Sequence, residues 1–321
     1  MMSNLSIQAL KMIPNLGKGA LLLLFLFAWS IPSYVAASGS DPNTLVIGKI
    51  SHNPKKHYRY LKPMLMYVVE RMRDLGITKG KIRMAKSKEH MAELLARGDV
   101  DWVTETPIAA SYLHEKSGAE LLLRKWKKNA SEYYTVFFSL KDGTIKKLED
   151  LKGKIIALED PASTTAYYLP VHAMLHNGLT PIKLKSFRET PPTDKVGFVF
   201  VREEINIATL VNKGLANAGA FSNLDWDKED HLPSQYRAQF SIIKKLPPVV
   251  RAVELVRRDL NPALKRRLEG ILLKAGDDPK AQPVLHAYQR TKKFDVLSSE
   301  QKQSIYDMYS IVDKVDQALI P

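Results

Sequence analysis

The sequence predicts an α/β protein with two lobes. Short apolar runs, typical of buried strands, alternate with amphipathic segments of helix length along most of the chain. The apolar run at residues 133–140 is long enough to leave one sheet and enter another. A chain of 321 residues is also longer than one hydrophobic core usually serves. We therefore expect two largely parallel sheets, with a ligand at the carboxyl ends of the strands.

The first 37 residues have the pattern of a signal peptide. Lys11 and Lys18 precede an apolar run at residues 20–29, and residues 35–37 read as a small-residue cleavage site. The run has about ten strongly apolar residues, whereas a membrane-spanning helix needs about 20. We expect residues 1–37 to be removed and the rest to fold outside the cytoplasm, in the periplasm. A retained anchor is the alternative.

The elements expected before the long apolar run follow a β-α-β order. Strands are expected at residues 45–50, 82–85, 100–104 and 120–124. The helices between them are expected at residues 59–75, 87–96 and 107–116, the last beginning at Pro107. This order favours parallel pairing of the strands.

A second series of strands and helices follows residue 140. A helical turn is expected at 148–151, a helix at 203–213, strands at 154–158, 196–201 and 217–221, apolar runs at 241–259, and an all-helical tail at 262–319. Residues 191–193 and 227–234 read as loops. We expect the chain to cross between lobes near 133–140 and 244–254. One lobe then comprises 38–137 and 250–321, and the other 138–249.

Three consecutive hydroxyl side chains begin the helix that follows strand 154–158. Asp160 and Pro161 turn the chain, Ser163, Thr164 and Thr165 follow, and the helical pattern runs to Gly178. The free N–H groups of a first helical turn and the positive end of the helix dipole attract an oxyanion, to which hydroxyl groups can donate. The alternative is that Ser163 only caps the helix.

The amino-acid composition limits the kinds of ligand and partner that the chain can bind. The chain has no cysteine, which excludes disulfides, a thiolate nucleophile and a Cys-based metal site. Its formal charge of +14 favours acidic partners, either small anions or an anionic surface. The basic residues are scattered and no nucleic-acid-reading motif accompanies them, so we expect no nucleic acid partner.

Enzyme and metal patterns are weak. No Gly-x-Ser-x-Gly elbow surrounds Ser163. His172 and His176 have the spacing of metal ligands on one helix, but the intervening Glu of the His-Glu-x-x-His pattern is missing. We expect no catalytic residue, no metal and no cofactor.

Several short motifs occur in an order that resembles the phosphate/phosphite/phosphonate substrate-binding proteins of ABC importers. They are Gly98-Asp-Val-Asp101, Thr106-Pro-Ile-Ala, Leu148-Glu-Asp-Leu-Lys-Gly-Lys154, Asp160-Pro-Ala-Ser-Thr164, Gly214, Ala218-Gly-Ala220 and Val256-Arg-Arg-Asp-Leu260. The resemblance covers residues 45–278, and the Asp-Pro-Ala-Ser-Thr element is its most diagnostic part. It implies a two-lobed, type II periplasmic binding protein with a hinge between its lobes, and not an enzyme.

The resemblance also implies a small oxyanion as ligand and a monomeric chain. The partner is an ABC permease or, alternatively, a membrane sensor kinase or cyclase. It implies that Ser163, Thr164 and Thr165 bind the oxyanion and that an aromatic from Tyr133-Tyr134, near the crossing, reaches the cleft. Residues at the end of the first strand (Ser51, His52) and at the turn Thr104-Glu105-Thr106 would line the opposite wall. From these two groups we take Tyr134, Ser51, Thr104 and Thr106 as candidate ligand-binding residues.

The chain departs from the family where members usually carry a His-containing element. It has Arg202, Glu203 and Glu204 at that point. Arg202 could grip the anion in bidentate fashion or pair with a glutamate. Glu204 or Glu105 could meet a cationic group of a zwitterion such as an aminoalkyl-phosphonate, or these glutamates point to solvent. We include Arg202 and Glu204 among the candidate ligand-binding residues.

Overall fold

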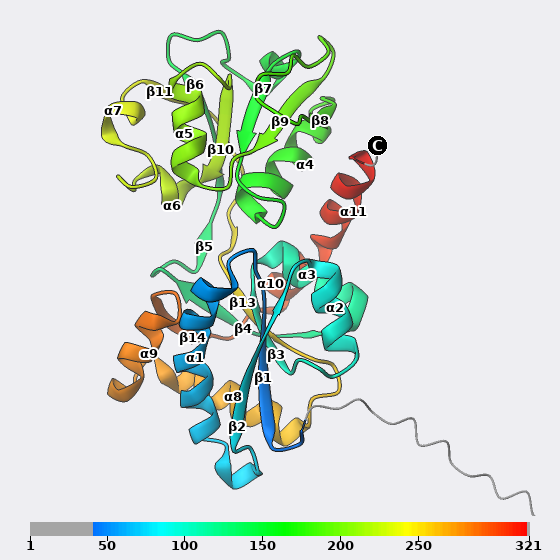
Figure 1. Ribbon diagram of the computed structural model, residues 1–321, viewed down its shortest axis with the longest axis vertical. Coiled ribbons are helices and arrows are strands. Elements are labelled where there is room, and N and C mark those ends of the chain that lie inside the picture. Colours follow the sequence, from blue (N-terminus) through cyan, green and yellow to red (C-terminus); the bar gives the residue numbers. More distant parts are fainter. Residues whose placement is uncertain (1–40, 320–321) are drawn as a thin grey trace, which may run out of the picture. The chain divides into compact units, whose positions relative to one another are not determined.

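The structure is a computed structural model that describes residues 41–319. The expected signal peptide, residues 1–37, lies outside the described residues. Two six-stranded sheets and one two-stranded sheet carry the fold, with helices packed around the larger sheets (Figure 1). Within residues 41–319, no helix is both long and apolar enough to cross a membrane.

The first sheet has the strand order β14-β4-β13-β3-β1-β2. Its strands are β1 (Thr44–Ile50), β2 (Lys79–Ala85), β3 (Trp102–Glu105), β4 (Glu120–Lys127), β13 (Val253–Val256) and β14 (Thr291–Asp295). β1 pairs in parallel with β2 and β3, so these three strands end at one edge of the sheet. The helices of this part are α1 (Pro54–Glu70), α2 (Lys88–Ala96), α3 (Pro107–Ser117), α8 (Pro262–Ala275), α9 (Gln282–Ala287) and α10 (Ser299–Asp307).

The second sheet has the order β11-β6-β10-β7-β9-β8. Its strands are β6 (Thr135–Leu140), β7 (Ile155–Leu158), β8 (Pro181–Lys183), β9 (Val196–Phe200), β10 (Ala218–Ser222) and β11 (Phe240–Lys245). Strands β7 to β10 are parallel, and β6 and β11 are antiparallel to their neighbours. Its helical segments are η3 (Thr164–Tyr168), α4 (Leu169–His176), α5 (Glu204–Asn212), α6 (Asn223–Trp226) and α7 (Ser234–Arg237).

A short ladder marks the passage between the two large sheets. β5 (Glu132–Tyr133) pairs antiparallel with β12 (Val249–Val250). The chain runs from β4 through β5 to β6, and it returns from β11 through β12 to β13. Residues 133–140 thus leave one sheet and enter another, as the apolar run predicts. The expected boundary at residues 249–250 coincides with β12, whereas the one at residues 137–138 falls inside β6 of the second sheet.

Two features of the tail differ from expectation. Residues 262–319 are not all helical, because β14 adds to the edge of β4 and its Phe294 packs into the core of the first sheet. The last helix, α11 (Tyr309–Ala318), buries Val312 and Val315 with the residues of the second sheet and not the first. Helix α11 therefore packs with the second sheet, although it belongs to the segment 250–321 that we assigned to the first lobe.

The start of α1 also differs from the sequence expectation. The helix begins at Pro54 rather than at residue 59, because the side chain of Asn53 accepts a hydrogen bond from Lys56 N and Pro54 occupies the first turn. This earlier start places His57 in the first turn of α1, close to the end of β1.

Candidate anion-binding site

The hydroxyl triplet lies on an irregular turn between β7 and α4. Segment η3 is a π-helix, and Ala166 inside it has φ −115°. Pro170 has no N–H, so it cannot bond to the carbonyl of Ala166 in the α-helical pattern. That carbonyl instead accepts a hydrogen bond of 3.2 Å from Glu159 N. Because Pro170 cannot donate to it, the carbonyl of Ala166 is free to accept this hydrogen bond, which holds the turn against the end of β7.

Of the three hydroxyl groups, that of Thr164 is buried without a hydrogen-bond partner in the described part of the chain. Ser163 Oγ accepts a hydrogen bond of 3.2 Å from Ala166 N, so Ser163 acts as the N-cap. Thr164 is only 1% exposed, and its Oγ1 makes no well-formed hydrogen bond within the described residues. Thr165 is also buried, and its carbonyl accepts a bond of 2.8 Å from Thr135 Oγ1. A buried hydroxyl without a partner is costly, so Thr164 is a candidate to donate a hydrogen bond to a ligand.

Arg251 meets the same turn from the crossing ladder. Its N–H donates to Ser131 O at 2.8 Å, which fixes it just after β12. Its guanidinium carbon lies 4.3 Å from the ring centroid of Tyr133, which is 3% exposed. Burial raises the pKa of Tyr133, while Arg251 and the hydroxyls of Thr164 and Thr165 oppose the rise. Arg251 Nε is buried and has no hydrogen-bond partner within the described residues.

Lys127 adds a second basic side chain close to Arg251. It has no carboxylate within salt-bridge distance in the described part of the chain. Burial and the nearby charges of Arg251, Lys49 and Lys125 hold the pKa of Lys127 well below its usual range. Cations are brought together here without enough anions to balance them, so an anionic ligand would be stabilised.

The other two lysines of this region have carboxylate partners. Lys49 Nζ lies 2.8 Å from Glu105 Oε2. Lys125 is fully buried, 3.5 Å from Glu254, and burial lowers its pKa to about 8. These two ion pairs belong to the interior of the first sheet.

Thr104 and Glu105, predicted as ligands, are already occupied. Thr104 Oγ1 accepts a hydrogen bond of 2.6 Å from Lys125 Nζ, next to Glu254. Glu105 accepts from Lys49 Nζ and also, at 2.7 Å, from Ile50 N. Both side chains therefore hold the ends of β1 and β3 together, and Glu105 has no free oxygen aimed at a cationic ligand group.

Thr106 has the free hydroxyl on this wall. It occupies the N-cap position of α3, but its side chain makes no cap hydrogen bond. Its buried Oγ1 has no partner within residues 41–319. Ile108, in the first turn of α3, belongs to the same buried hydrophobic cluster as Tyr167 and Tyr168 of η3, and α3 contacts η3. The first turn of α3 therefore packs against the same π-helical segment that carries Thr164.

Ser51 lies at the end of β1 and is tied to His57. The Ser51 Oγ and His57 Nδ1 atoms are 2.6 Å apart, and Ser51 Oγ also accepts from Asn53 N at 3.0 Å. Burial, together with Lys49 and Lys127, lowers the pKa of His57 to about 4. His57 is therefore neutral at pH 7. His52, expected on the same wall, is exposed.

Arg202 and Glu204 do not pair with each other. Arg202 is exposed, has φ 70°, and has no ion pair in the described part of the chain. Glu204 Oε2 instead lies 3.5 Å from His231 Nδ1, which is also 2.9 Å from Asp225 Oδ1. Glu204, Asp225 and His231 could together hold a metal ion. However, Lys228 Nζ already donates to Asp225 at 2.6 Å, so a cation occupies this carboxylate.

The aromatic beside the hydroxyl turn is Tyr133. Tyr134 is half-buried and is held by its backbone, whose N–H donates to Asn223 Oδ1 at 2.8 Å. Sequence reasoning missed Arg251 and Lys127. Their only sequence signal is a cation placed at the end of an apolar strand, as in Val249-Val250-Arg251.

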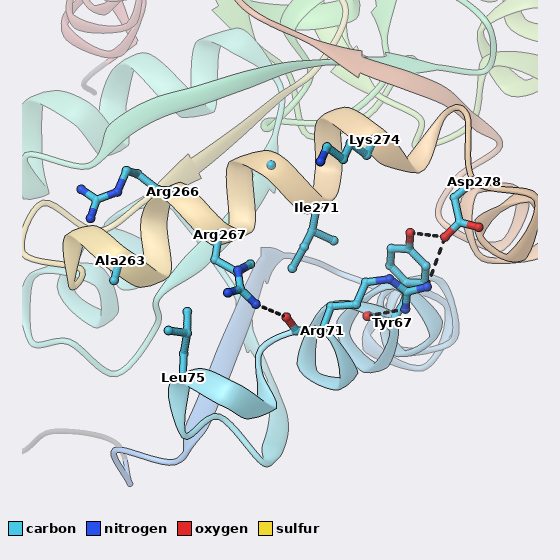
Figure 2. Close-up of a pocket in the computed structure, with 10 residues that line it drawn as sticks. Tyr67, Arg71, Leu75, Ala263, Arg266, Arg267, Ile271, Lys274 and Asp278 are labelled. Atoms are coloured by element: carbon cyan, nitrogen blue, oxygen red, sulfur yellow. Dashed lines mark hydrogen bonds and ion pairs between the residues drawn. The ribbon is translucent and has the colours of Figure 1, made fainter.

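A separate pocket of about 830 Å³ lies between α1 and α8 (Figure 2). Four basic side chains line it, but two of them are paired within the protein. Arg71 bonds to Asp278 at 3.1 Å, and Arg267 bonds to Asp74 at 2.7 Å. Tyr67 Oη also donates to Asp278. The hydroxyl turn and Arg251 contribute nothing to this pocket, so we do not identify it as the ligand site.

Solved structures of proteins from two bacteria are similar to this chain. Two structures of XAC2383 from Xanthomonas citri, one bound to chloride ion and one to ATP, are 38% identical to it. They cover 86% and 87% of this chain and 100% of their own, with TM-scores of 0.82 and 0.81. PhnD1 from Prochlorococcus marinus, in complex with methylphosphonate, is 16% identical, covers 85% of this chain and 100% of its own, and has a TM-score of 0.62. At that identity the last comparison shows the fold alone.

A family model places the sequence more directly. No sequence match was found among proteins of curated function. The model described as ABC transporter, phosphonate, periplasmic substrate-binding protein matches residues 50–301, which is most of the chain. The two sheets and the hydroxyl turn after β7 agree with the resemblance drawn from the sequence motifs. The chain belongs to the family of phosphonate periplasmic substrate-binding proteins of ABC transporters.

Proposed function

We propose that this chain captures a small oxyanion of the phosphate, phosphite or phosphonate class in the periplasm and delivers it to an ABC permease. Family members are periplasmic substrate-binding proteins that bind small phosphonates, work with ABC permeases and are not enzymes. The observation that carries the proposal is a set of buried donor atoms without partners: Thr106 Oγ1, Thr164 Oγ1 and Arg251 Nε.

The chemistry of these donors supports an oxyanion. Thr164 and Thr165 stand in a first helical turn, where backbone N–H groups lack carbonyl partners. Arg251 offers a guanidinium, and Lys127 adds a basic side chain without a carboxylate partner within the described residues. Hydroxyl, amide and guanidinium groups are donors from which phosphate oxygens accept hydrogen bonds. The structures that are 38% identical hold chloride and ATP, which are both anions.

A panel of anions tests the proposal. Phosphate, phosphite and methylphosphonate, with sulfate for comparison, would be added to the purified protein during thermal unfolding. A ligand at about 100 times its dissociation constant stabilises the folded state by about 2.7 kcal/mol, which raises the melting temperature measurably. We expect at least one phosphorus oxyanion to do so. No shift and no calorimetric heat with any of them would overturn the proposal.

A further inference from the structure

The pocket of about 830 Å³ between α1 and α8 is lined by a glycine in the interior of a helix. This glycine is Gly270 of α8. A Cβ atom added to it would meet no atom of the described residues within 4 Å, its own stretch of helix apart. Glycine inside a helix is less stable than alanine, because it loses more backbone freedom on folding. No packing contact of the described residues requires this glycine, so the open space beside it is available to a bound group.

Two unpaired cations flank the glycine on α8. Arg266, Gly270 and Lys274, which we call the notch row, are spaced four residues apart, so they lie in one line along the helix. Arg266 and Lys274 are exposed and form no ion pair within residues 41–319. At the rise of an α-helix, their Cα atoms are about 12 Å apart. The row therefore presents two positive charges on either side of an open space.

The other charged groups of the pocket are already bound to one another. Asp278, the one carboxylate among the lining residues, accepts from Tyr67 Oη at 2.7 Å and from Arg71 Nη2 at 3.1 Å. The guanidinium carbon of Arg71 also lies 3.6 Å from the ring centroid of Tyr67. Arg267 donates to both oxygens of Asp74, at 2.8 and 2.7 Å, and to Arg71 O at 2.9 Å. These contacts fix the shape of the pocket, and its available positive charge comes from the notch row.

The rest of the pocket lining is largely apolar. Leu75, Ala263 and Ile271 contribute to it, and Figure 2 shows Leu75 and Ile271 extending toward one another from the segment after α1 and from α8. A concave pocket of this size accepts a side chain of a bound segment, whereas the surface of a bilayer cannot enter it. The pocket thus combines an apolar interior with two cations at its rim.

An extended peptide matches the spacing of the notch row. Its side chains i, i+2 and i+4 share one face, and residues i and i+4 are about 13 Å apart. We propose that the pocket binds an extended segment of a partner protein with the pattern acidic-x-apolar-x-acidic. The two carboxylates meet Arg266 and Lys274, and the apolar side chain enters beside Gly270. No residue of the hydroxyl turn lines this pocket, so the inference goes beyond the proposed function and does not depend on it.

Fluorescence anisotropy with labelled peptides tests the inference. The probe is Gly-Asp-Thr-Leu-Thr-Asp-Gly, and its control carries Asn in place of both Asp residues. We expect the acidic peptide to bind about fivefold to tenfold more tightly at low salt, because two exposed charge pairs each contribute modestly and are screened by salt. Equal affinities of the two peptides, or no binding of either, would overturn the inference and leave the proposed oxyanion function standing.

Two further probes separate the alternatives. Binding of phosphatidylglycerol vesicles without any peptide binding would overturn the inference in favour of a membrane surface. In a helical peptide, acids must stand eight residues apart to span about 12 Å. Tighter binding of such a peptide would contradict the extended form.

Variants of the notch row locate the contact. Without ligand, Gly270→Leu should melt at a higher temperature than the parent, because leucine favours a helix more than glycine does. It should nevertheless bind the acidic peptide at least tenfold more weakly, because its side chain fills the open space. Arg266→Gln and Lys274→Gln should each lose part of the preference for the acidic peptide. Lys280→Gln, at an exposed lysine outside the pocket, is the matched control and should change nothing.

The same variants distinguish this pocket from the oxyanion site. Gly270→Leu should bind the best oxyanion of the anion panel as tightly as the parent does. A loss of oxyanion affinity in Gly270→Leu would show that the pocket is the oxyanion site and overturn the inference. Unchanged peptide affinity in Gly270→Leu would contradict the assigned position.

Discussion

The guanidinium carbon of Arg251 lies 4.3 Å from the ring centroid of Tyr133, and both residues belong to the segments that join the two sheets. Tyr133 lies on β5, and Arg251 directly follows β12, the strand that pairs with β5. A cation–π contact at this distance keeps the guanidinium in place while leaving its N–H groups free to donate. The proposed anion contact is therefore built on the crossing ladder itself, which links ligand binding to the position of the lobes.

Replacing Arg251 by Gln should weaken the bound oxyanion by roughly tenfold to a hundredfold, because one charge-assisted hydrogen bond is worth about 1.5 to 3 kcal/mol. Isothermal titration calorimetry with the best ligand of the anion panel measures the loss. Arg266→Gln is the control, since Arg266 is exposed and lines the separate pocket beside α8. A larger loss in Arg266→Gln would move the site to that pocket.

Thr164→Val should separate binding from stability. The substitution keeps the shape of the side chain but removes a donor, so ligand affinity should fall by roughly tenfold or more. Because Thr164 Oγ1 has no well-formed hydrogen bond, the ligand-free variant should be as stable as the parent or more stable. Denaturant unfolding without ligand gives the second readout.

The matched change is Thr180→Val at an exposed threonine, which should alter neither quantity. If Thr164→Val lowered the ligand-free stability and left affinity unchanged, Thr164 would be a structural residue and not a ligand contact.

Stability should fall as the pH drops from about 6.5 toward 4. Burial and neighbouring lysines lower the pKa of His57 to about 4 from its usual 6.5. In this range the unfolded chain takes up a proton that the folded chain does not, so acid favours unfolding, and the His57 contribution is fully present only above pH 6.5. Urea midpoints measured across this range should decline less steeply in His57→Gln than in the parent.

His52→Gln serves as the comparison for that pH profile, because His52 is exposed on the adjacent loop. Identical slopes in the parent and in His57→Gln would show that His57 titrates normally.

Bound oxyanion should also raise the pKa of His57, so binding below pH 6 should take up protons. Calorimetry in two buffers of different ionisation enthalpy measures that uptake.

A contact between helical segments that pack on different sheets should affect how far the lobes close when ligand binds. Lys88 Nζ, on α2, donates to Tyr168 Oη of η3 and to Asp316 of α11, each at 2.9 Å. Burial alone would lower the pKa of Lys88, but the hydrogen bonds to Tyr168 and Asp316 raise this pKa above its usual value. Lys88→Met should remove this contact and lessen any closure of the lobes.

Small-angle scattering with and without ligand checks this expectation. We expect the parent to become more compact on binding, as hinge closure requires. The ligand-free Lys88→Met variant should have a larger radius of gyration than the ligand-free parent. A radius that is unchanged by ligand in the parent would indicate a rigid site and contradict the hinge.

The sequence predicted the elements that depend on local pattern. The hydroxyl turn, the helix beginning at Pro107 and the parallel strands before it were all visible in periodicity and turn residues. The π-helical shape of η3 was not, because it depends on Glu159 N meeting the carbonyl that Pro170 leaves free. Strand β14 was not predicted because it lies at the edge of its sheet, where Lys292 and Lys293 make its sequence polar and leave no apolar strand pattern.

The candidate binding residues divide in the same way. Thr164 and Thr165 were predicted because their neighbours in sequence place them in a first helical turn. Thr104 was predicted on its position after β3, but tertiary packing gives its hydroxyl to Lys125. Arg251 could not be found from sequence, because its role arises from a cation–π contact with a strand more than a hundred residues away in the chain.

The central claim is that an oxyanion sits on Thr164 and Arg251. A crystal structure grown with the tightest-binding phosphorus oxyanion tests it most directly. The account predicts one oxygen of that anion within hydrogen-bond distance of Thr164 Oγ1 and another within hydrogen-bond distance of Arg251 Nε, with Thr106 and Lys127 beside them. An anion bound instead among Arg266, Lys274 and Arg71, with Thr164 and Arg251 still unpartnered, would contradict it.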